Sequence, residues 1–478
     1  MKSYDVAVVG GGIVGGSVLR ELTKYKLSVC LLEKESDVAM GQSRANSGIV
    51  HAGFDAVPGT LKAKFNVAGN RMMQAYAEEL GVKYKNNGSL VVAFSEEELE
   101  ALSALKARGE ANGVPRLQIL SVGELREKEP NISDEALGAL YAPTGGIVCP
   151  YGLTIASIGN AMDNGAELYL DFEAVKIEKS QNGFTVGSAD GREIFCKLVI
   201  NCAGYGSGKI AKLAGDDSVK IGGRRGEYVL LDRESGNFVS HTLFFAPTKL
   251  GKGILVSPTV DGNLLLGPTA EEVSENDVST SAAGIASILE KAKKMCPAVP
   301  VYNGITSFAG VRAYSDKHDF IIEESAAVEG LIHCAGIESP GLTAAPAIAE
   351  YVVGELVKRR LPLQKNENFC GTRKAEFYFQ SLSAEEKNKI IADHPAYGRI
   401  VCRCEQITEG EIVRAIRENP PARSVDAVKR RTRAGMGRCQ GGFCQPQVAE
   451  ILARELNIPF EQVRKSGAGS ELVTGAVK

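Results

Sequence analysis

The sequence has no tryptophan and no apolar run long enough to span a membrane. Its longest apolar stretches, 6–19 and 342–353, fall short of the ~20 residues that a spanning helix needs, and both contain glycine, proline or charged residues. The chain enters the strand-like stretch VAVVG at Val6, which leaves no room for a secretory signal peptide. We therefore expect a cytoplasmic protein without a transmembrane segment.

The sequence also lacks an excess of charge of either sign. It has 55 lysine and arginine residues against 58 aspartate and glutamate residues, for a net charge of −3. Such a molecule has no overall field that would attract nucleic acid, so we expect no nucleic-acid partner. At 478 residues the chain is too long for one ordinary core, and two or three domains are expected.

Three glycines near the N-terminus have the spacing of a dinucleotide-binding turn. The stretch YDVAVVGGGIVGGSVLRELTKYKLSVCLLEK predicts a strand, then Gly10-x-Gly12-x-x-Gly15, then a helix and a second strand that ends at Glu33. The glycines allow a tight turn, close approach of a pyrophosphate and close packing of the helix. The helix N-terminus offers free N–H groups to the phosphates, and Glu33 can accept hydrogen bonds from ribose hydroxyls. The motif predicts a nucleotide cofactor and leaves FAD and NAD open.

Three later segments favour FAD by resemblance. GQSRANSGIVHAGFD (41–55), KLVINCAGYGS (197–207) and GLIHCAGIESPGLTAAPAIAEYV (330–352) are similar to segments of FAD-dependent oxidoreductases of the D-amino-acid-oxidase superfamily. The resemblance covers residues 1–360 and is closest to the L-2-hydroxyglutarate oxidase/dehydrogenase branch, with a looser similarity to FAD-dependent glycerol-3-phosphate dehydrogenases. It implies that FAD is bound by Ser43, Asn46, Ser47, Gly48, Gly204, Gly336, Gly341, Leu342 and Thr343 in addition to the glycine turn and Glu33.

The resemblance also implies a fold class, which is α/β in its first domain and α+β overall. The discontinuous Rossmann-like FAD domain is expected at 1–82, 151–219 and 316–365. An inserted antiparallel-sheet substrate domain is expected at 83–150 and 220–315, where stretches such as GSLVVAF and GEYVLLD predict strands. A connecting helix or linker at 366–397 then leads to a small helical domain at 398–478.

Two side chains are candidates for catalysis. His51 lies in the 41–55 motif, which in the related flavoenzymes runs beside the flavin ring, so a neutral imidazole there can take a hydroxyl proton. The alternative is a histidine that only hydrogen-bonds the flavin or a carbonyl group. Arg312 belongs to a Gly-Val-Arg turn that in related enzymes presents its planar fork to the substrate's anionic group. For Arg312 the alternative is a surface salt bridge.

Asp55 departs from the glycerol-3-phosphate dehydrogenase pattern. Those enzymes tend to carry arginine four residues after the motif histidine, where it helps to hold the phosphate, but this chain carries a carboxylate. A carboxylate there would repel a phosphate dianion. If the substrate is a phosphate, we expect Lys62, Lys64 or an arginine of the substrate domain to compensate.

Four of the eleven cysteines form two close pairs near the C-terminus, Cys402 with Cys404 and Cys439 with Cys444. Their pattern, C-x-C-x34-C-x4-C, resembles the [2Fe–2S] domain of the bacterioferritin-associated ferredoxin type, which is also found in anaerobic glycerol-3-phosphate dehydrogenase large subunits. Four thiolates are the ligands of such a cluster, and a structural zinc site is the less favoured alternative. The basic residues between the pairs are expected to offset the cluster's negative charge; they are Lys429, Arg430, Arg431, Arg433 and Arg438.

Helices are predicted around the cysteines. Thr408-x-x-Glu411 is a capping box that predicts a helix after the first pair, and Gly435 is expected to close a second helix. A third helix is expected to begin near Pro446.

A fused cluster would give the electrons of a reduced flavin an exit other than oxygen. The sequence therefore predicts an FAD-dependent dehydrogenase that oxidises the C–OH carbon of a small anion. The favoured substrate is sn-glycerol 3-phosphate, which yields dihydroxyacetone phosphate, and the alternative is L-2-hydroxyglutarate. Other hypotheses are a non-catalytic electron-transfer subunit and an amine-oxidising flavoenzyme. By resemblance, the electron acceptor would be a partner flavoprotein or a membrane-bound subunit.

Overall fold

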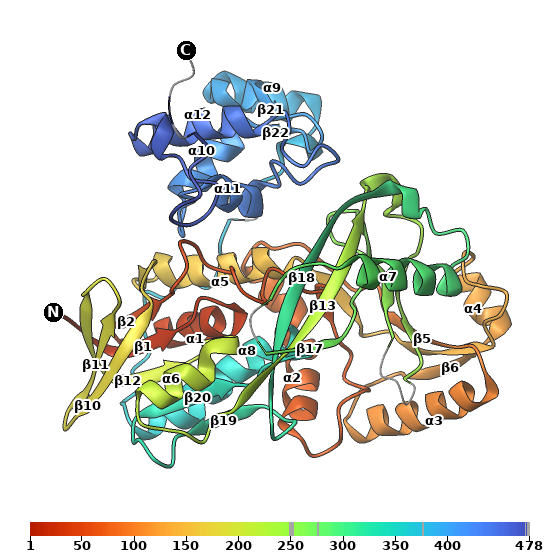
Figure 1. Cartoon of the computed structure of the whole chain (residues 1–478), viewed down its shortest axis with the longest axis horizontal. Coiled ribbons are helices and arrows are strands. Elements are labelled where there is room, and N and C mark those ends of the chain that lie inside the picture. Colours follow the sequence, from red (N-terminus) through yellow and green to blue (C-terminus); the bar gives the residue numbers. More distant parts are fainter. Residues whose placement is uncertain (248–252, 275–276, 375–376, 474, 476–478) are drawn as a thin grey trace.

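The computed structural model describes residues 1–247, 253–274, 277–374, 377–473 and 475. Figure 1 shows a body in which two sheet-containing parts lie side by side, and a smaller helical lobe formed by the C-terminal residues above them. The predicted fold class is confirmed, because the structure contains a largely parallel sheet, a largely antiparallel sheet and a small helical domain.

The first sheet is the one that the N-terminal motif predicts. β1 (Lys2–Val9) pairs in parallel with β2 (Val29–Leu32) and with β12 (Glu193–Asn201), which pairs in parallel with β20 (Leu331–Ala335). The order is β10-β11-β12-β1-β2-β9, with β20 beside β12 and β19 beside β20. The remaining strands are β9 (Glu167–Tyr169), β10 (Ala174–Ser180), β11 (Gly183–Ser188) and β19 (Ile321–Glu324).

Helices cover both faces of this sheet because successive residues of a strand point to opposite faces. Val6 and Val8 of β1 lie in a core that includes residues of α1 (Ile13–Thr23), α5 (Pro150–Asp163) and α8 (Gly341–Tyr351). Ala7 and Val9 lie in the opposite core, beside α6 (Ser207–Leu213). α2 (Leu61–Glu79) packs against α8 and is capped by Thr60, whose hydroxyl accepts the Ala63 N–H.

The second sheet has the order β17-β13-β16-β15-β14-β5-β7-β6, with β18 beside β13. Its pairs are antiparallel as predicted, except that β14 pairs with β5 in parallel. The strands are β5 (Ser89–Ala93), β6 (Gln118–Ser121), β7 (Gly138–Ala142), β13 (Ile221–Leu231), β14 (Thr242–Phe245), β15 (Leu255–Pro258), β16 (Leu264–Gly267), β17 (Glu271–Val273) and β18 (Gly304–Ser315). The accompanying helices are α3 (Glu96–Ala111), α4 (Val122–Lys128) and α7 (Ala282–Met295).

A small third sheet connects the segment before His51 with the segment before α5. β8 (Gly146–Val148) lies between β3 (Ile49–Val50) and β4 (Tyr84–Lys85), and both pairs are antiparallel. Because β3 leads directly into His51, this pairing fixes where the histidine leaves the sheet.

The C-terminal lobe consists of a β-hairpin and three principal helices around their own apolar core. These elements are β21 (Ile400–Cys402), β22 (Ile407–Thr408), α10 (Glu409–Arg417), α11 (Val425–Thr432) and α12 (Gln445–Leu456). The capping box of α10 and the start of α12 at Gln445, directly before Pro446, agree with the predictions. The prediction that Gly435 closes α11 is wrong, because the helix ends at Thr432 and Arg433 already takes the left-handed conformation.

The segment 366–397, predicted as a connecting helix or linker, contains secondary structure of its own. It contains α9 (Ala384–Asp393), which Ser383 and Glu386 cap reciprocally, and the turn Pro395–Gly398 packs against α10. Part of this segment therefore lies in the C-terminal lobe, as Figure 1 shows. The boundaries predicted for the FAD, substrate and cluster domains stay predictions. Among the described residues, no helix is long and apolar enough to cross a membrane.

Candidate active site

The glycine turn between β1 and α1 is too crowded for side chains. Gly10 has a φ of +111°, and a Cβ there would lie 2.4 Å from the Cys202 carbonyl oxygen. A Cβ on Gly15 would lie 2.0 Å from the Gly10 carbonyl oxygen, and Gly12 forms the N-cap of α1. The turn thus brings the N-terminus of α1 against β1 with an open backbone, which is the geometry that a pyrophosphate needs.

Glu33 lies beside this turn, directly after β2. Its carboxylate accepts the Gly11 N–H at 2.6 Å and the Glu35 N–H at 2.9 Å. Burial raises the pKa of Glu33 to about 7 although both hydrogen bonds favour the charged form. A buried carboxyl group at the end of β2 is suited to bind ribose hydroxyls.

The 41–48 segment forms a folded loop next to the start of α1. Ser43 accepts the Ile13 N–H at 2.9 Å, and the Asn46 side chain both donates to the Gln42 carbonyl and accepts the Gly48 N–H. Ser47 is half-buried in the same loop. Gly48 has a φ of +65°, and a Cβ there would lie 2.6 Å from the Val148 carbonyl oxygen.

Two of the other glycines predicted to bind FAD lie just after strands, and the third begins a helix. Gly204 follows β12 with a φ of +57°, and Gly336 follows β20 with a φ of +63°. Gly341 is the first residue of α8, Leu342 is half-buried, and Thr343 is buried. The Thr343 hydroxyl accepts the His51 N–H at 2.9 Å, so α8 and the 41–55 motif meet here. The carboxyl ends of parallel strands and the N-terminus of α1 together fit a bound FAD.

His51 is held through its backbone. Its N–H binds Thr343, and its carbonyl accepts the side-chain amides of Asn66 at 2.7 Å and Asn70 at 3.1 Å. The ring Nε2 lies 3.2 Å from the Ser339 hydroxyl, and the ring centroid lies 6.0 Å from that of Phe244. The backbone hydrogen bonds fix the position of His51, and the imidazole contacts Ser339 from that position.

Arg312 lies within strand β18, opposite Arg224 of β13 in the strand register, so the prediction that Gly-Val-Arg forms a turn is wrong. One Nη2 hydrogen bond goes to the Thr269 carbonyl at 2.9 Å, while the buried Nε has no hydrogen-bond partner. A half-buried guanidinium whose buried Nε has no partner is suited to bind an anion, since leaving such a donor unpaired is unfavourable. No carboxylate among the described residues forms an ion pair with Arg312, which favours the anion-binding role over a surface salt bridge; that role stays a prediction.

Two residues that the sequence analysis missed connect these parts. Gln42 donates to the Ile337 carbonyl at 2.7 Å and accepts the Ala313 N–H at 3.0 Å, so it ties the 41–48 loop to β18 beside Arg312. Glu338 accepts Lys62 at 2.7 Å and lies 4.0 Å from Arg224. Gln42, Glu338 and Ser339 all lie within the motifs 41–55 and 330–352, so their position in those motifs was the available signal.

The lysines expected to compensate for Asp55 are otherwise engaged. Lys62 pairs with Glu338, and the Lys64 ammonium lies 4.6 Å from the centroid of the Tyr351 ring. The Asp55 carbonyl accepts the Arg108 guanidinium at 3.1 Å. Among the groups expected to compensate, the arginines of the substrate domain are therefore the better candidates. Arg225, Arg233 and Arg312 each have a buried Nε without a hydrogen-bond partner, but Arg225 and Arg233 are ion-paired through their other nitrogens.

The four C-terminal cysteines come together as two pairs. The Cys404 and Cys439 sulfurs are 3.7 Å apart. A hydrogen bond from the Cys444 thiol lowers the pKa of Cys402 to about 6, and both residues lie in the core of the lobe. No group of three or more ligating side chains in the described residues is arranged for a single metal ion. Two thiolates for each of two irons is the ligand set of a [2Fe–2S] cluster.

Matches to two family models agree with these sites. Residues 5–354 match the family of FAD dependent oxidoreductases, and residues 400–454 match the BFD-like [2Fe-2S] binding domain. The cofactor prediction of FAD and a [2Fe–2S] cluster, with zinc as the less favoured ion, is thereby confirmed.

Similar proteins cover different shares of the chain. A glycerol 3-phosphate dehydrogenase of Caloramator mitchellensis is 48% identical over 477 residues, which is 99% of each chain. An L-2-hydroxyglutarate dehydrogenase of Escherichia coli strain K12 is 31% identical over 76% of this chain and 95% of that protein. The structure of dithionite-reduced L-alpha-glycerophosphate oxidase from Mycoplasma pneumoniae with FAD bound has a TM-score of 0.75 and 32% identity, over 79% of this chain and 100% of that one.

Proposed function

The chain belongs to the FAD dependent oxidoreductase family, and we propose that it is a dehydrogenase that oxidises sn-glycerol 3-phosphate to dihydroxyacetone phosphate. The observation that carries the proposal is the full-length similarity to a glycerol 3-phosphate dehydrogenase, which includes the cluster domain. The oxidase of similar structure lacks a counterpart to about a fifth of this chain. A fused one-electron centre gives a dehydrogenase an exit for electrons that an oxidase, which passes them to oxygen, does not need.

Arg312 binds the substrate's anion in this proposal. Its Nε is buried without a partner, and its Nη2 is fixed by the Thr269 carbonyl, so the fork is oriented before a ligand arrives. Arg224, the cross-strand neighbour, adds a second positive charge that Glu272 and Glu338 partly neutralise. In this proposal these two arginines, rather than Lys62 or Lys64, supply the positive charge that a phosphate needs.

His51 takes the proton. Oxidation of C–OH to C=O removes the hydroxyl proton and removes a hydride from the carbon, and the His51 Nε2 accepts the proton as a general base. Ser339, 3.2 Å away, orients the ring and can pass the proton on. When bound, FAD accepts the hydride's two electrons and the [2Fe–2S] cluster carries them onward singly.

L-2-hydroxyglutarate is the second candidate substrate. The observation that favours it is Asp55, a carboxylate four residues after His51 that would disfavour a phosphate dianion, together with the 31% identity to an L-2-hydroxyglutarate dehydrogenase. A carboxylate has one charge fewer than a phosphate dianion and fits the Arg312 fork bidentately.

The proposal extends to partners and compartment. A partner flavoprotein or a membrane-bound subunit would take the electrons from the cluster. A reducing cytoplasm suits the chain because all eleven cysteines lie in described residues and none forms a disulfide there.

An anaerobic absorbance titration tests the proposal. The iron-replete, FAD-loaded protein is titrated with sn-glycerol 3-phosphate and, separately, with L-2-hydroxyglutarate. We expect glycerol 3-phosphate to bleach the flavin band stoichiometrically and L-2-hydroxyglutarate to leave it unchanged. The reverse result would replace the first substrate by the second. If only dithionite bleaches the band, the electron-transfer subunit and the amine oxidase become the better explanations.

A further inference from the structure

Arg433 joins the cluster-binding loop to the substrate domain. Its Nε donates to Glu405 at 2.8 Å, its Nη1 to Asp261 at 2.8 Å and its Nη2 to Asn263 at 3.0 Å. Glu405 directly follows Cys404, whereas Asp261 and Asn263 lie in the turn between β15 and β16. The Arg433 side chain therefore contacts both the loop that carries Cys402 and Cys404 and a turn 172 residues away in sequence.

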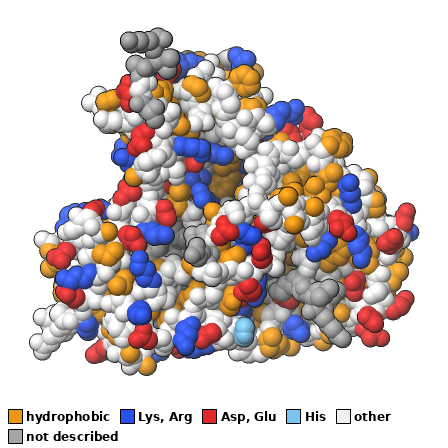
Figure 2. All heavy atoms as spheres, viewed as in Figure 1, with side chains coloured by type: hydrophobic (Ala, Val, Ile, Leu, Met, Phe, Trp, Pro, Cys, Tyr) orange, Lys and Arg blue, Asp and Glu red, His pale blue; other side chains and the backbone are white. Residues whose placement is uncertain are grey.

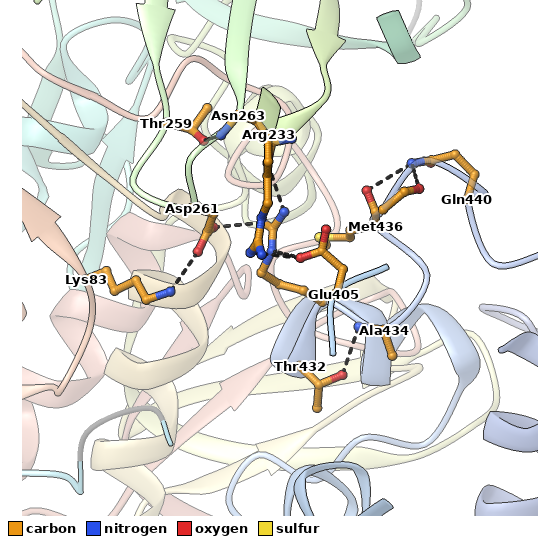
Figure 3. A network of polar contacts seen from close by, with 12 residues as sticks. Lys83, Arg233, Thr259, Asp261, Asn263, Glu405, Thr432, Ala434, Met436 and Gln440 are labelled. Atoms are coloured by element: carbon orange, nitrogen blue, oxygen red, sulfur yellow. Dashed lines mark hydrogen bonds and ion pairs between the residues drawn. The ribbon is translucent and has the colours of Figure 1, made fainter. Parts of the chain in front are cut away.

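The contact of Arg433 is buried, and each of its two acidic partners also binds a second basic residue. The side chains of Arg433, Glu405 and Asp261 are 8%, 2% and 7% exposed. Lys83 also binds Asp261 at 3.2 Å, and Arg233 binds Glu405 at 2.9 Å. Figure 3 shows Asp261, Asn263, Arg233 and Glu405 pointing toward one another across the boundary between the domains. Every charge in this cluster has an opposite charge beside it, which a buried ion requires.

The backbone of Arg433 is specialised for this position. It has a φ of +70° at the C-cap of α11, a conformation that side chains other than glycine rarely adopt and that surrounding contacts must maintain. This conformation ends the helix, and the chain then continues toward Cys439 and Cys444.

The other arginines of this basic segment have different partners from Arg433. Arg430 and Arg431 pair with Asp37 of the FAD domain, and Arg438 pairs with Asp232 and Glu234. Arg438 is 60% exposed, so its pairs contribute little. Figure 2 shows basic and acidic side chains together along the boundary between the upper lobe and the body. Among these arginines, Arg433 is the one that contacts the residue next to Cys404.

We infer that Arg433 is a positioning residue, which uses the β15–β16 turn of the substrate domain to hold the Cys402–Glu405 loop in its cluster-binding conformation. This inference deepens the proposed function and rests on it, because the loop matters to the reaction only if the cluster carries the substrate's electrons. In this arrangement Asp261 supports the cluster from another domain, as residues around metal ligands commonly do.

Iron release tests the inference without using the substrate. The holoenzyme is mixed with a ferrous chelator after reduction by dithionite, and the rate of iron release is compared for Arg433→Met, Asp261→Asn and the parent chain. We expect both variants to release iron about tenfold faster, the lower end of the range for lost support around a metal ligand. We also expect a changed electron paramagnetic resonance signal of the reduced cluster. Unchanged FAD absorbance shows that each variant has folded.

Glu234→Gln is the matched control, since it removes the exposed ion pair with Arg438 across the same boundary without changing a residue beside a cysteine, and it should release iron at the parent's rate. If Asp261→Asn releases iron like the parent, the inference is wrong, whatever Arg433→Met does. Equal acceleration by Glu234→Gln would also overturn it, because that result would indicate general loosening of the lobe. A chain that fails to oxidise glycerol 3-phosphate but shows the Asp261→Asn effect would contradict the proposed substrate alone.

Discussion

The imidazole of His51 makes a different contribution from the His51 backbone. The N–H and carbonyl of this residue hold the loop to Thr343, Asn66 and Asn70, and a substitution leaves these bonds in place. We therefore expect His51→Ala to bind FAD normally and to lose turnover by about 10²- to 10⁴-fold, the usual contribution of a general base. Steady-state rates and bound FAD per chain measure the two effects.

The control for this variant is His394→Ala, which removes an exposed histidine from the C-terminal lobe and should retain the parent's rate. Loss of FAD from His51→Ala would mean that the ring, rather than the backbone, supports the cofactor. Full turnover would assign the proton to another group.

Glu33 makes the stability of the FAD-free protein depend on pH. Its pKa rises from 4.5 in the unfolded chain to about 7 in the folded protein because the carboxyl is buried. The folded protein thus binds a proton that the unfolded chain releases, so this contribution is complete below pH 4.5 and is lost as the pH rises through about 7. The full loss is about 3 kcal/mol. Urea unfolding across this range should show it in the parent and not in Glu33→Gln.

At the scale of elements, the β1–turn–α1 unit depends on Gly15. A methyl group there would overlap the Gly10 carbonyl oxygen at 2.0 Å and contact the Cys202 side chain. We expect Gly15→Ala to push α1 away from β1, to cost about 1–3 kcal/mol or more, and to abolish FAD retention. Calorimetry and the absorbance of bound flavin measure this. Gly354→Ala is the control, because no atom lies within 4 Å of the added methyl group; equal losses in both variants would refute the steric explanation.

Elements with local signals could be predicted from the sequence. β1, α1 and β2 follow from alternation and glycine spacing, and α10 begins at the predicted capping box. The end of α11 could not be predicted, because Arg433 leaves the helix in a conformation that its distant partners Asp261 and Glu405 maintain. The parallel pairing of β14 with β5 also had no local signal, since it joins strands far apart in the sequence.

At the scale of the whole molecule, some parts of the site have a local signal in the sequence, and others depend on contacts between distant residues. The glycine turn, His51 and the cysteine pairs lie in motifs that the sequence displays. The partner of each charged residue is set by the packing of three domains, so the sequence did not indicate that Lys62 binds Glu338 or that Arg433 binds Asp261. Ser339 was missed although it lies between two predicted residues, because its role depends on where His51 points.

The cluster lobe separates substrate oxidation from electron exit, and removal of one cluster ligand tests this separation. Cys404→Ser removes a thiolate that faces Cys439, while His51, Arg312 and the glycine turn lie in other domains. We expect the flavin band to bleach with substrate as in the parent, the cluster's resonance signal to disappear, and turnover with ferricyanide, a one-electron acceptor, to fall about 10- to 100-fold. Cys370→Ser, which changes an exposed cysteine outside the lobe's core, should behave as the parent. If Cys404→Ser reduces ferricyanide at the parent's rate, electrons leave directly from the flavin, and the lobe has another role.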